Sequence, residues 1–267
     1  MAVERIADLD DPRLEDYRHL REPSRRMTVE RSRGIFTLEG ALSVEALLAS
    51  PYVTRSVLVA EEHADKMVAR LGAEVALFAM PSSAMTDLTG VHFHRGVLAV
   101  AERPEPRSLA EVVRGARTVV VLEGVNDHEN IGAIFRNAAA FGVDAVILDP
   151  TTADPLYRRA TRVSLGHVLR VPFARVERWP DALGELRELG FTTLALTPSR
   201  DADPLGAVVA GPPARLALVL GAEGPGLTTS ALASADHRVR IPMAEGVDSV
   251  NVATAAAIAL SAIFGWS

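Results

Sequence analysis

The second half of the chain alternates continuous apolar runs with segments of helical periodicity. Apolar runs that predict buried β-strands lie at residues 118–122, 145–148, 168–171, 192–196 and 216–220. Helical patterns between them predict helices at 131–141 and 181–189, which end at Gly142 and Gly190. Strands of this kind separated by helices indicate a mostly parallel sheet that is covered on both faces, so the predicted fold class is α/β.

The first hundred residues have shorter elements. Short β-type runs lie at residues 34–40, 56–60, 76–79 and 97–101. Helical patterns at 42–48 and 61–71 separate them and predict a small α/β unit. Residues 102–107 contain two prolines and four charged side chains, which suit neither a helix nor a strand. We therefore predict two domains, residues 1–105 and 106–267.

Composition narrows the function classes. The 267 residues are 48% hydrophobic and include no cysteine, which excludes disulfides, thiolate metal sites and a cysteine nucleophile. The N-terminus is charged and does not resemble a signal peptide. The apolar stretch 252–266 is interrupted by Thr254 and Ser261 and is too short for a comfortable membrane span. We expect a cytoplasmic protein without a membrane segment, with a buried C-terminal helix.

The basic residues are nearly all arginine. Net charge is −6, from 28 basic and 34 acidic residues, and Lys66 is the only lysine. Arginine can bind phosphate with both arms of its guanidinium and can stack on bases, although a GC-rich genome would also favour it. Residues 13–33 carry seven arginines and four acidic residues. The segment is a predicted RNA-binding surface, with Arg25, Arg26, Arg31 and Arg33 as contact residues.

Three loops after predicted strands carry the candidate chemistry. In residues 126–137, Asn130 lies where a side chain can cap a helix, and Arg136 follows within two turns. The same pattern fits a capped helix with a surface arginine.

The second loop, residues 220–227, contains three glycines and a proline and can approach a ligand by its backbone. Glu223 occupies the place of the second glycine of a dinucleotide fingerprint, so a nucleotide-binding oxidoreductase lacks its motif here. A purely structural turn is the alternative. The third loop, residues 241–254, places Ser249 and Asn251 at the start of the Ala-rich final helix, whereas capping needs only one of them.

Together the loops resemble the SpoU (TrmH-like) family of RNA ribose 2′-O-methyltransferases, in the SPOUT superfamily. The motifs are Asn130-x-Gly-Ala-x-x-Arg136, Gly221-x-Glu-Gly-x-Gly226, and Ile241-Pro-Met with Ser249-Val-Asn-Val-Ala253. Their order and spacing carry the resemblance, which covers residues 118–267. The first domain resembles the L30e-like RNA-binding domain, through Phe36-x-x-Glu-Gly40 and Arg95-Gly-Val-Leu-Ala99.

The resemblance implies S-adenosylmethionine bound in a trefoil knot, no metal, and a homodimer whose interface completes the sites. It assigns cofactor binding to Thr197, Gly221, Ile241, Met243, Val250 and Ala253. It assigns catalytic or substrate-contacting roles to Arg136, Asn130, Glu223, Ser249 and Asn251. The family's general-base role for Arg136 is chemically awkward because arginine stays protonated at neutral pH. We favour a phosphate grip that also stabilises the developing oxyanion.

We therefore predict an S-adenosylmethionine-dependent RNA ribose 2′-O-methyltransferase with ribosomal RNA as substrate. Transfer RNA is the alternative substrate, by family analogy only. A SpoU-like RNA-binding protein without catalysis is the alternative from a different class, and the intact Arg136, Ser249 and Asn251 argue against it.

Overall fold

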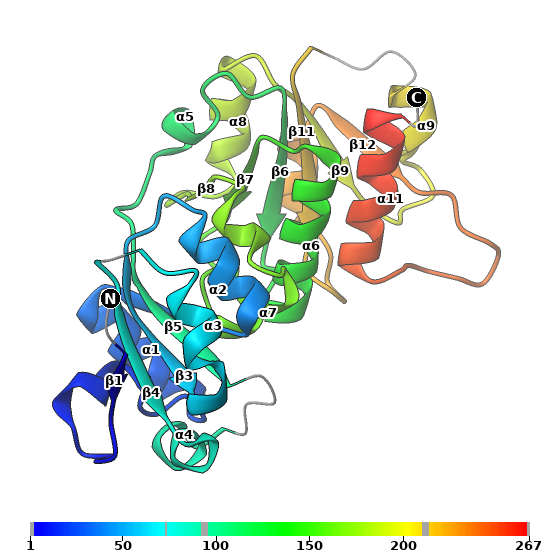
Figure 1. Cartoon of the computed structure of the whole chain (residues 1–267). Helices are drawn as coiled ribbons and strands as arrows, with labels where there is room; N and C mark the ends of the chain where they lie inside the picture. The colour runs from blue at the N-terminus through cyan, green and yellow to red at the C-terminus, as the bar shows by residue number, and fades with distance from the viewer. Residues whose placement is uncertain (1–2, 73, 92–95, 210–213, 266–267) are drawn as a thin grey trace. The chain divides into compact units, whose positions relative to one another are not determined.

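The computed structural model describes residues 3–72, 74–91, 96–209 and 214–265, which form two units (Figure 1). Unit 1 comprises residues 1–105 and 156–169, and unit 2 comprises residues 106–155 and 170–267. The chain therefore leaves unit 2 after Pro155 and returns at Arg170. The predicted domain boundaries assign residues 156–169 to the second domain, whereas the structure places them in unit 1.

Unit 2 is built on a parallel sheet. Its strands are β6 (Thr118–Glu123), β7 (Ala145–Leu148), β8 (Phe173–Arg175), β9 (Thr192–Leu196), β10 (Asp203–Pro204), β11 (Leu216–Gly221) and β12 (His237–Arg240). Their order is β10-β12-β9-β11-β6-β7-β8, and every pairing between them is parallel. The predicted α/β fold class with a mostly parallel sheet is confirmed. The trefoil knot stays a prediction.

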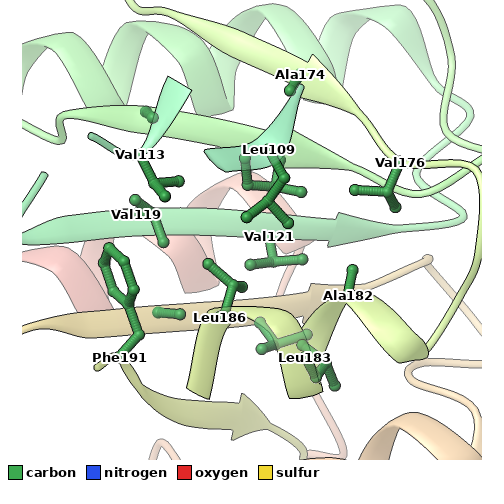
Figure 2. Close-up of a cluster of buried hydrophobic side chains, with 14 of the residues drawn as sticks. Leu109, Val113, Val119, Val121, Ala174, Val176, Ala182, Leu183, Leu186 and Phe191 are labelled. Atoms are coloured by element: carbon green, nitrogen blue, oxygen red, sulfur yellow. The ribbon is translucent and has the colours of Figure 1, made fainter. Parts of the chain in front are cut away.

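Helices cover both faces of this sheet, because successive strand residues point to opposite faces and both sets are apolar. One face carries α5 (Leu109–Val112), α8 (Asp181–Glu188) and α10 (Thr229–Ser234), and the other carries α6 (His128–Phe141), α9 (Leu205–Val209) and α11 (Val252–Phe264). Figure 2 shows the core of the first face, where Val119 and Val121 of β6 pack against Leu183 and Leu186 of α8. On the other face α6 and α11 lie side by side (Figure 1).

The strand predicted at residues 168–171 is wrong. His167–Leu169 form a short 3-10 helix, and β8 begins only at Phe173. Val168 and Leu169 are buried, so the run is apolar because of burial rather than strand pairing. Gly166, at φ +79°, leaves no room for a side chain, since a Cβ there would lie 2.4 Å from that of Ala46.

Unit 1 has a mixed five-stranded sheet. Its strands are β1 (Glu4–Arg5), β2 (Ile35–Glu39), β3 (Thr54–Ala60), β4 (Ala76–Met80) and β5 (Val97–Glu102), in the order β1-β4-β3-β5-β2. Its α-helices are α1 (Pro23–Arg33), α2 (Ala41–Leu48), α3 (Ala64–Val68), α4 (Ser82–Thr89) and α7 (Arg158–Val163). The segment 156–169 belongs to this unit, where Arg158 and Arg162 of α7 pair with Glu39 of β2. No described helix in either unit is both long and apolar enough to cross a membrane.

One predicted RNA contact, Arg26, is wrong because its side chain is buried. Only 1% of the Arg26 side chain and 2% of the Glu30 side chain are exposed, and Arg26 Nε lies 2.9 Å from Glu30 Oε1. Arg26 also donates to the Thr37 hydroxyl of β2 and to the Arg18 carbonyl. Burial raises the pKa of the Glu30 carboxyl, while the guanidinium of Arg26 acts in the opposite direction. Arg26 therefore joins α1 to the sheet.

Replacing Arg26 should destabilise unit 1 strongly. Arg26→Ala leaves the Glu30 carboxyl buried without its cation, and breaking such a pair costs about 3–5 kcal/mol in the free energy of unfolding. The exposed neighbour Arg25 provides the control, because Arg25→Ala should change that free energy by less than about 0.5 kcal/mol. Urea denaturation followed by circular dichroism measures both. Equal stabilities of the two variants would contradict the structural role of Arg26.

Candidate functional site

A cavity of about 310 Å³ opens in unit 2 where the carboxyl ends of β9 and β11 meet the segment after β12 and the first turn of α11. The predicted site residues that line it are Thr197, Gly221, Glu223, Ile241, Met243, Ser249, Val250 and Asn251. In a parallel sheet the loops that follow the strands gather at one edge, which is where ligands bind in such folds. The second and third loops identified in the sequence, residues 220–227 and 241–254, thus line one cavity, whereas no residue of the first loop, 126–137, lines it.

The loop after β11 is closed tightly on itself. The Gly226 amide donates to the Ala222 carbonyl at 3.0 Å. A Cβ on Gly221 would lie 2.3 Å from the carbonyl carbon of Gly226, so only glycine fits at this position. The close approach leaves Gly221, Glu223 and Gly224 at the cavity surface.

Asn251 fixes the polar wall of the cavity. Its Oδ1 accepts from the Ala253 amide at 3.0 Å and from the Thr254 amide at 3.2 Å, which caps α11. Its Nδ2 donates to Asn130 Oδ1 at 2.8 Å and to Glu223 Oε1 at 2.6 Å. Since the cap holds the oxygen on the helix, the amino group must face the other two loops. One amide therefore ties all three predicted motifs together.

The expected capping role of Asn130 is wrong. Helix α6 begins at His128, and the side chain of Asp127 caps it by accepting from the Glu129 amide at 2.7 Å. Asn130 lies one turn further on, is 7% exposed, and uses its oxygen for Asn251. The sequence signal for the true cap was present, since aspartate also favours this position.

Three predicted site residues do not line the cavity: Asn130, which reaches it only through its bond to Asn251, and also Ala253 and Arg136. Ala253 is buried beneath it, where its carbonyl accepts from Asn137 Nδ2 at 2.9 Å. Arg136 is exposed on α6 and forms no ion pair with another described residue. The face of α6 that bonds to α11 is that of Asn130 and Asn137, seven residues apart, and Arg136 lies about 100° away from Asn137 around the helix. Within one chain the structure does not bring Arg136 to the other candidates.

The lining suits a ligand with one apolar and one polar part. Leu196, Leu220, Ile241 and Val252 supply an apolar wall that fits a planar heterocycle. Glu223 offers a carboxylate that favours a cationic or amine-bearing group. These features fit S-adenosylmethionine. Within the described ranges, no three histidine or acidic residues gather as metal ligands would.

A second cavity, of about 420 Å³, lies in unit 1 and is lined by basic residues of α3 and its flanks together with apolar residues and Glu45. His63, Lys66 and Arg70 line it, and Glu45 of α2 pairs with Arg70. Sequence reasoning gave these residues no role, although Lys66 was conspicuous as the only lysine. Arg95, quoted for the L30e-like resemblance, lies outside the described residues.

Sequence comparison relates the chain to RNA methyltransferases. The model of the SpoU rRNA Methylase family matches residues 117–261. The "uncharacterized tRNA/rRNA methyltransferase Rv0881" of Mycobacterium tuberculosis is 50% identical over 264 residues, covering 96% of this chain and 90% of that protein. The 23S rRNA (guanosine(2553)-2′-O)-methyltransferase RlmP of Bacillus subtilis is 27% identical over 256 residues, covering 96% and 97%.

Solved structures share the whole fold. An AdoMet-bound rRNA methyltransferase from Sinorhizobium meliloti superposes with a TM-score of 0.82 at 24% identity, over 98% of this chain and 97% of that one. An RNA methyltransferase of the TrmH family from Porphyromonas gingivalis, described as putative, has a TM-score of 0.78 at 26% identity, over 96% and 98%. Both units are therefore present in the structural relatives.

Changing the Asn251 amide should disturb the polar wall. Asn251→Asp keeps an oxygen on the α11 cap but turns a second oxygen towards Asn130 Oδ1 and Glu223 Oε1, which are both acceptors. Losing these bonds should lower the free energy of unfolding by about 1–3 kcal/mol. Ser249→Ala is the control, since Ser249 is exposed and makes no hydrogen bond with another described residue. Urea denaturation compares them, and an equal effect of both substitutions would contradict the bridging role.

Proposed function

Because this chain belongs to the SpoU rRNA methylase family, we propose that it transfers the methyl group of S-adenosylmethionine to a ribose 2′-hydroxyl of ribosomal RNA. The single observation that carries the proposal is the Asn251 bridge, which joins all three motif loops at one cavity. Ribosomal RNA is favoured over transfer RNA by the substrate in the name of the Bacillus relative. Such a substrate would place the protein in the cytoplasm.

The lining residues divide the work of binding the cofactor. S-adenosylmethionine supplies an activated methyl group when bound. Ile241, Met243 and the apolar wall would hold the adenine, and the closely approached backbone at Gly221 and Val250 would offer amides and carbonyls to polar atoms. Thr197, the residue directly after β9, lines the cavity on the side of that strand. Ala253 supports this wall from beneath, through its bonds to Asn137 and Asn251.

Glu223 and Ser249 would orient the ribose hydroxyl, and Asn251 and Asn130 would hold Glu223 in place. Asn251 holds the Glu223 carboxylate through Oε1, which leaves Oε2 for the substrate or the cofactor. Ser249, exposed at the cavity, offers a hydroxyl that can donate or accept. Asn130 keeps the bridge rigid. Because these dipoles are fixed before the substrate binds, aligning the oxygen with the methyl group requires little reorganisation.

Arg136 would act on the substrate phosphate and on the negative charge that develops on the ribose oxygen. It lies outside the cavity of its own chain, on the face of α6 and α11 that the described structure leaves exposed. Exposed apolar side chains on α11 are Ile258 and Phe264, each 41% exposed, and Phe141 of α6 stacks on Phe264 at 6.5 Å. A homodimer formed through this face would bury the apolar residues and bring one copy's Arg136 to its partner's cavity.

Unit 1 would hold the RNA backbone. The arginines Arg25, Arg31 and Arg33 stay predicted contacts, although Arg33 already donates to Asp16 at 2.7 Å. The cavity with Lys66 and Arg70 adds further positive charge to unit 1. Phosphate contacts of this kind position RNA without specifying its bases.

The functional test is single-turnover transfer of labelled methyl from S-adenosylmethionine to RNA. Arg136→Ala should slow transfer about 10²–10³-fold, the usual cost of losing one preorganised electrostatic donor. Cofactor affinity should hardly change, because Arg136 does not line the cavity. Arg136→Lys should restore part of the rate, since lysine keeps the charge but not the forked geometry.

Ribosomal and transfer RNA from a strain that lacks the gene are offered separately, and the products are tested for ribose methylation. Methylation of transfer RNA alone would show that transfer RNA, and not ribosomal RNA, is the substrate. A fully active Arg136→Ala variant would remove this residue from the mechanism.

The dimer has its own test. Ala257→Arg places a long charged side chain on the partly exposed face of α11, where close packing with a second copy would exclude it. Light scattering at micromolar concentration should give a dimer mass for the parent and a lower mass for this variant. Ala233→Arg, on exposed α10 across the sheet, should stay dimeric. A monomeric parent would contradict the assembly.

A further inference from the structure

A buried carboxylate outside the cavity joins three segments of unit 2. Glu123, the last residue of β6, is 5% exposed. Its Oε1 accepts from Trp179 Nε1 at 2.5 Å and from the Thr228 hydroxyl at 2.7 Å, and its Oε2 accepts from the Thr228 amide at 2.9 Å. Neither Glu123 nor its two partners line the cavity.

Glu123 contacts the residues at both ends of the glycine-rich loop, Gly221 and Thr228. It is the register neighbour of Gly221, where the loop leaves β11. It also holds Thr228, where the loop enters α10 and where the threonine hydroxyl caps the helix by accepting from the Ala231 amide at 3.2 Å. The cavity-lining residues Glu223, Gly224 and Gly226 lie between these two points, so one carboxylate fixes the span of the loop.

The bonding pattern requires a carboxylate rather than an amide. All three hydrogens point towards Glu123, and both of its oxygens accept. A glutamine would turn an NH₂ group towards either the Thr228 amide or the Trp179 indole, each of which can only donate. One donor of a part-buried hydrogen bond would then face another donor and lose its partner, which is unfavourable.

We propose that Glu123 is a positioning residue for the cofactor: by anchoring Thr228 it sets the loop that places Glu223 and the backbone at Gly224 and Gly226 around the methyl donor. This inference rests on the proposed function, because it takes the cavity to be the S-adenosylmethionine site. Within the loop the Gly226 amide bonds to the Ala222 carbonyl, while Gly224 and Gly226, with φ of +84° and +71°, lie outside helix and strand. The bonds from Thr228 to Glu123 fix the end of the loop that this internal bond does not reach. The effect reaches the polar wall through the bond from Asn251 to Glu223 at 2.6 Å.

The test compares Glu123→Gln with Trp179→Phe. Isothermal titration with S-adenosylmethionine should give a Kd about tenfold higher for Glu123→Gln, equivalent to about 1.4 kcal/mol. KM for S-adenosylmethionine should rise while kcat at saturation changes far less. Trp179→Phe removes the indole donor but keeps an aromatic ring and both bonds from Thr228 to Glu123, so its Kd should match the parent's. Thr228→Val removes one donor to the carboxylate and should raise Kd as Glu123→Gln does.

Hydrogen exchange of the ligand-free proteins separates this inference from the proposed function. The Gly226 and Thr228 amides should lose protection in Glu123→Gln and keep it in Trp179→Phe. Parent-like protection and Kd in both Glu123→Gln and Thr228→Val would overturn the anchor, as would an equal rise of Kd in Trp179→Phe. A parent that binds no S-adenosylmethionine would refute the proposed function, and the exchange data would still decide whether Glu123 holds the loop.

Discussion

Parallel pairing of β6, β9 and β11 is the constraint on which the candidate site depends. Because the strands run in one direction, their carboxyl ends meet at one edge, and the loops after them must share that space. The helices that return from this edge also begin there, so the free amides at the start of α11 lie beside the loop after β11. Asn251 satisfies these amides and bonds to Glu223 with the same side chain. The topology thus turns a capping residue into a site residue.

The buried strands were predictable because a strand covered on both faces must be apolar at every position. This is why β6, β7, β9 and β11 follow the apolar runs closely. The run at 168–171 has the same apolar pattern, but its first two residues are buried in unit 1 and the chain returns to unit 2 at Arg170. No local pattern says which unit will cover a segment. The motif residues were predictable by resemblance. Which of them line the cavity depends on helix phase and on packing, and neither can be predicted from the motifs.

The arginines show a similar limit. Arg25 and Arg26 are neighbours in an Arg-rich segment, yet one is exposed and the other is 1% exposed. An arginine and a glutamate four residues apart are typical of a solvated helix face. Here Thr37 of β2 supplies a third group, and the pair Arg26–Glu30 becomes the polar contact between α1 and the sheet. Because Thr37 lies eleven residues after Arg26 and in a different element, the sequence of α1 alone does not predict this contact.

The distribution of charge around the cavity bears on how the reaction is arranged. The polar wall within one chain contains a carboxylate, amides and a hydroxyl, while the cation predicted for the reaction, Arg136, lies on an exposed helix face. A carboxylate favours a cationic cofactor but opposes a negative charge growing on the ribose oxygen, so the reaction needs a compensating positive charge. In the proposed homodimer that charge would lie on a surface that a second copy covers, so cofactor binding would need one chain and methyl transfer would need two. A site divided in this way would keep the activated methyl donor unreactive until the partner subunit and the RNA phosphate were both in place.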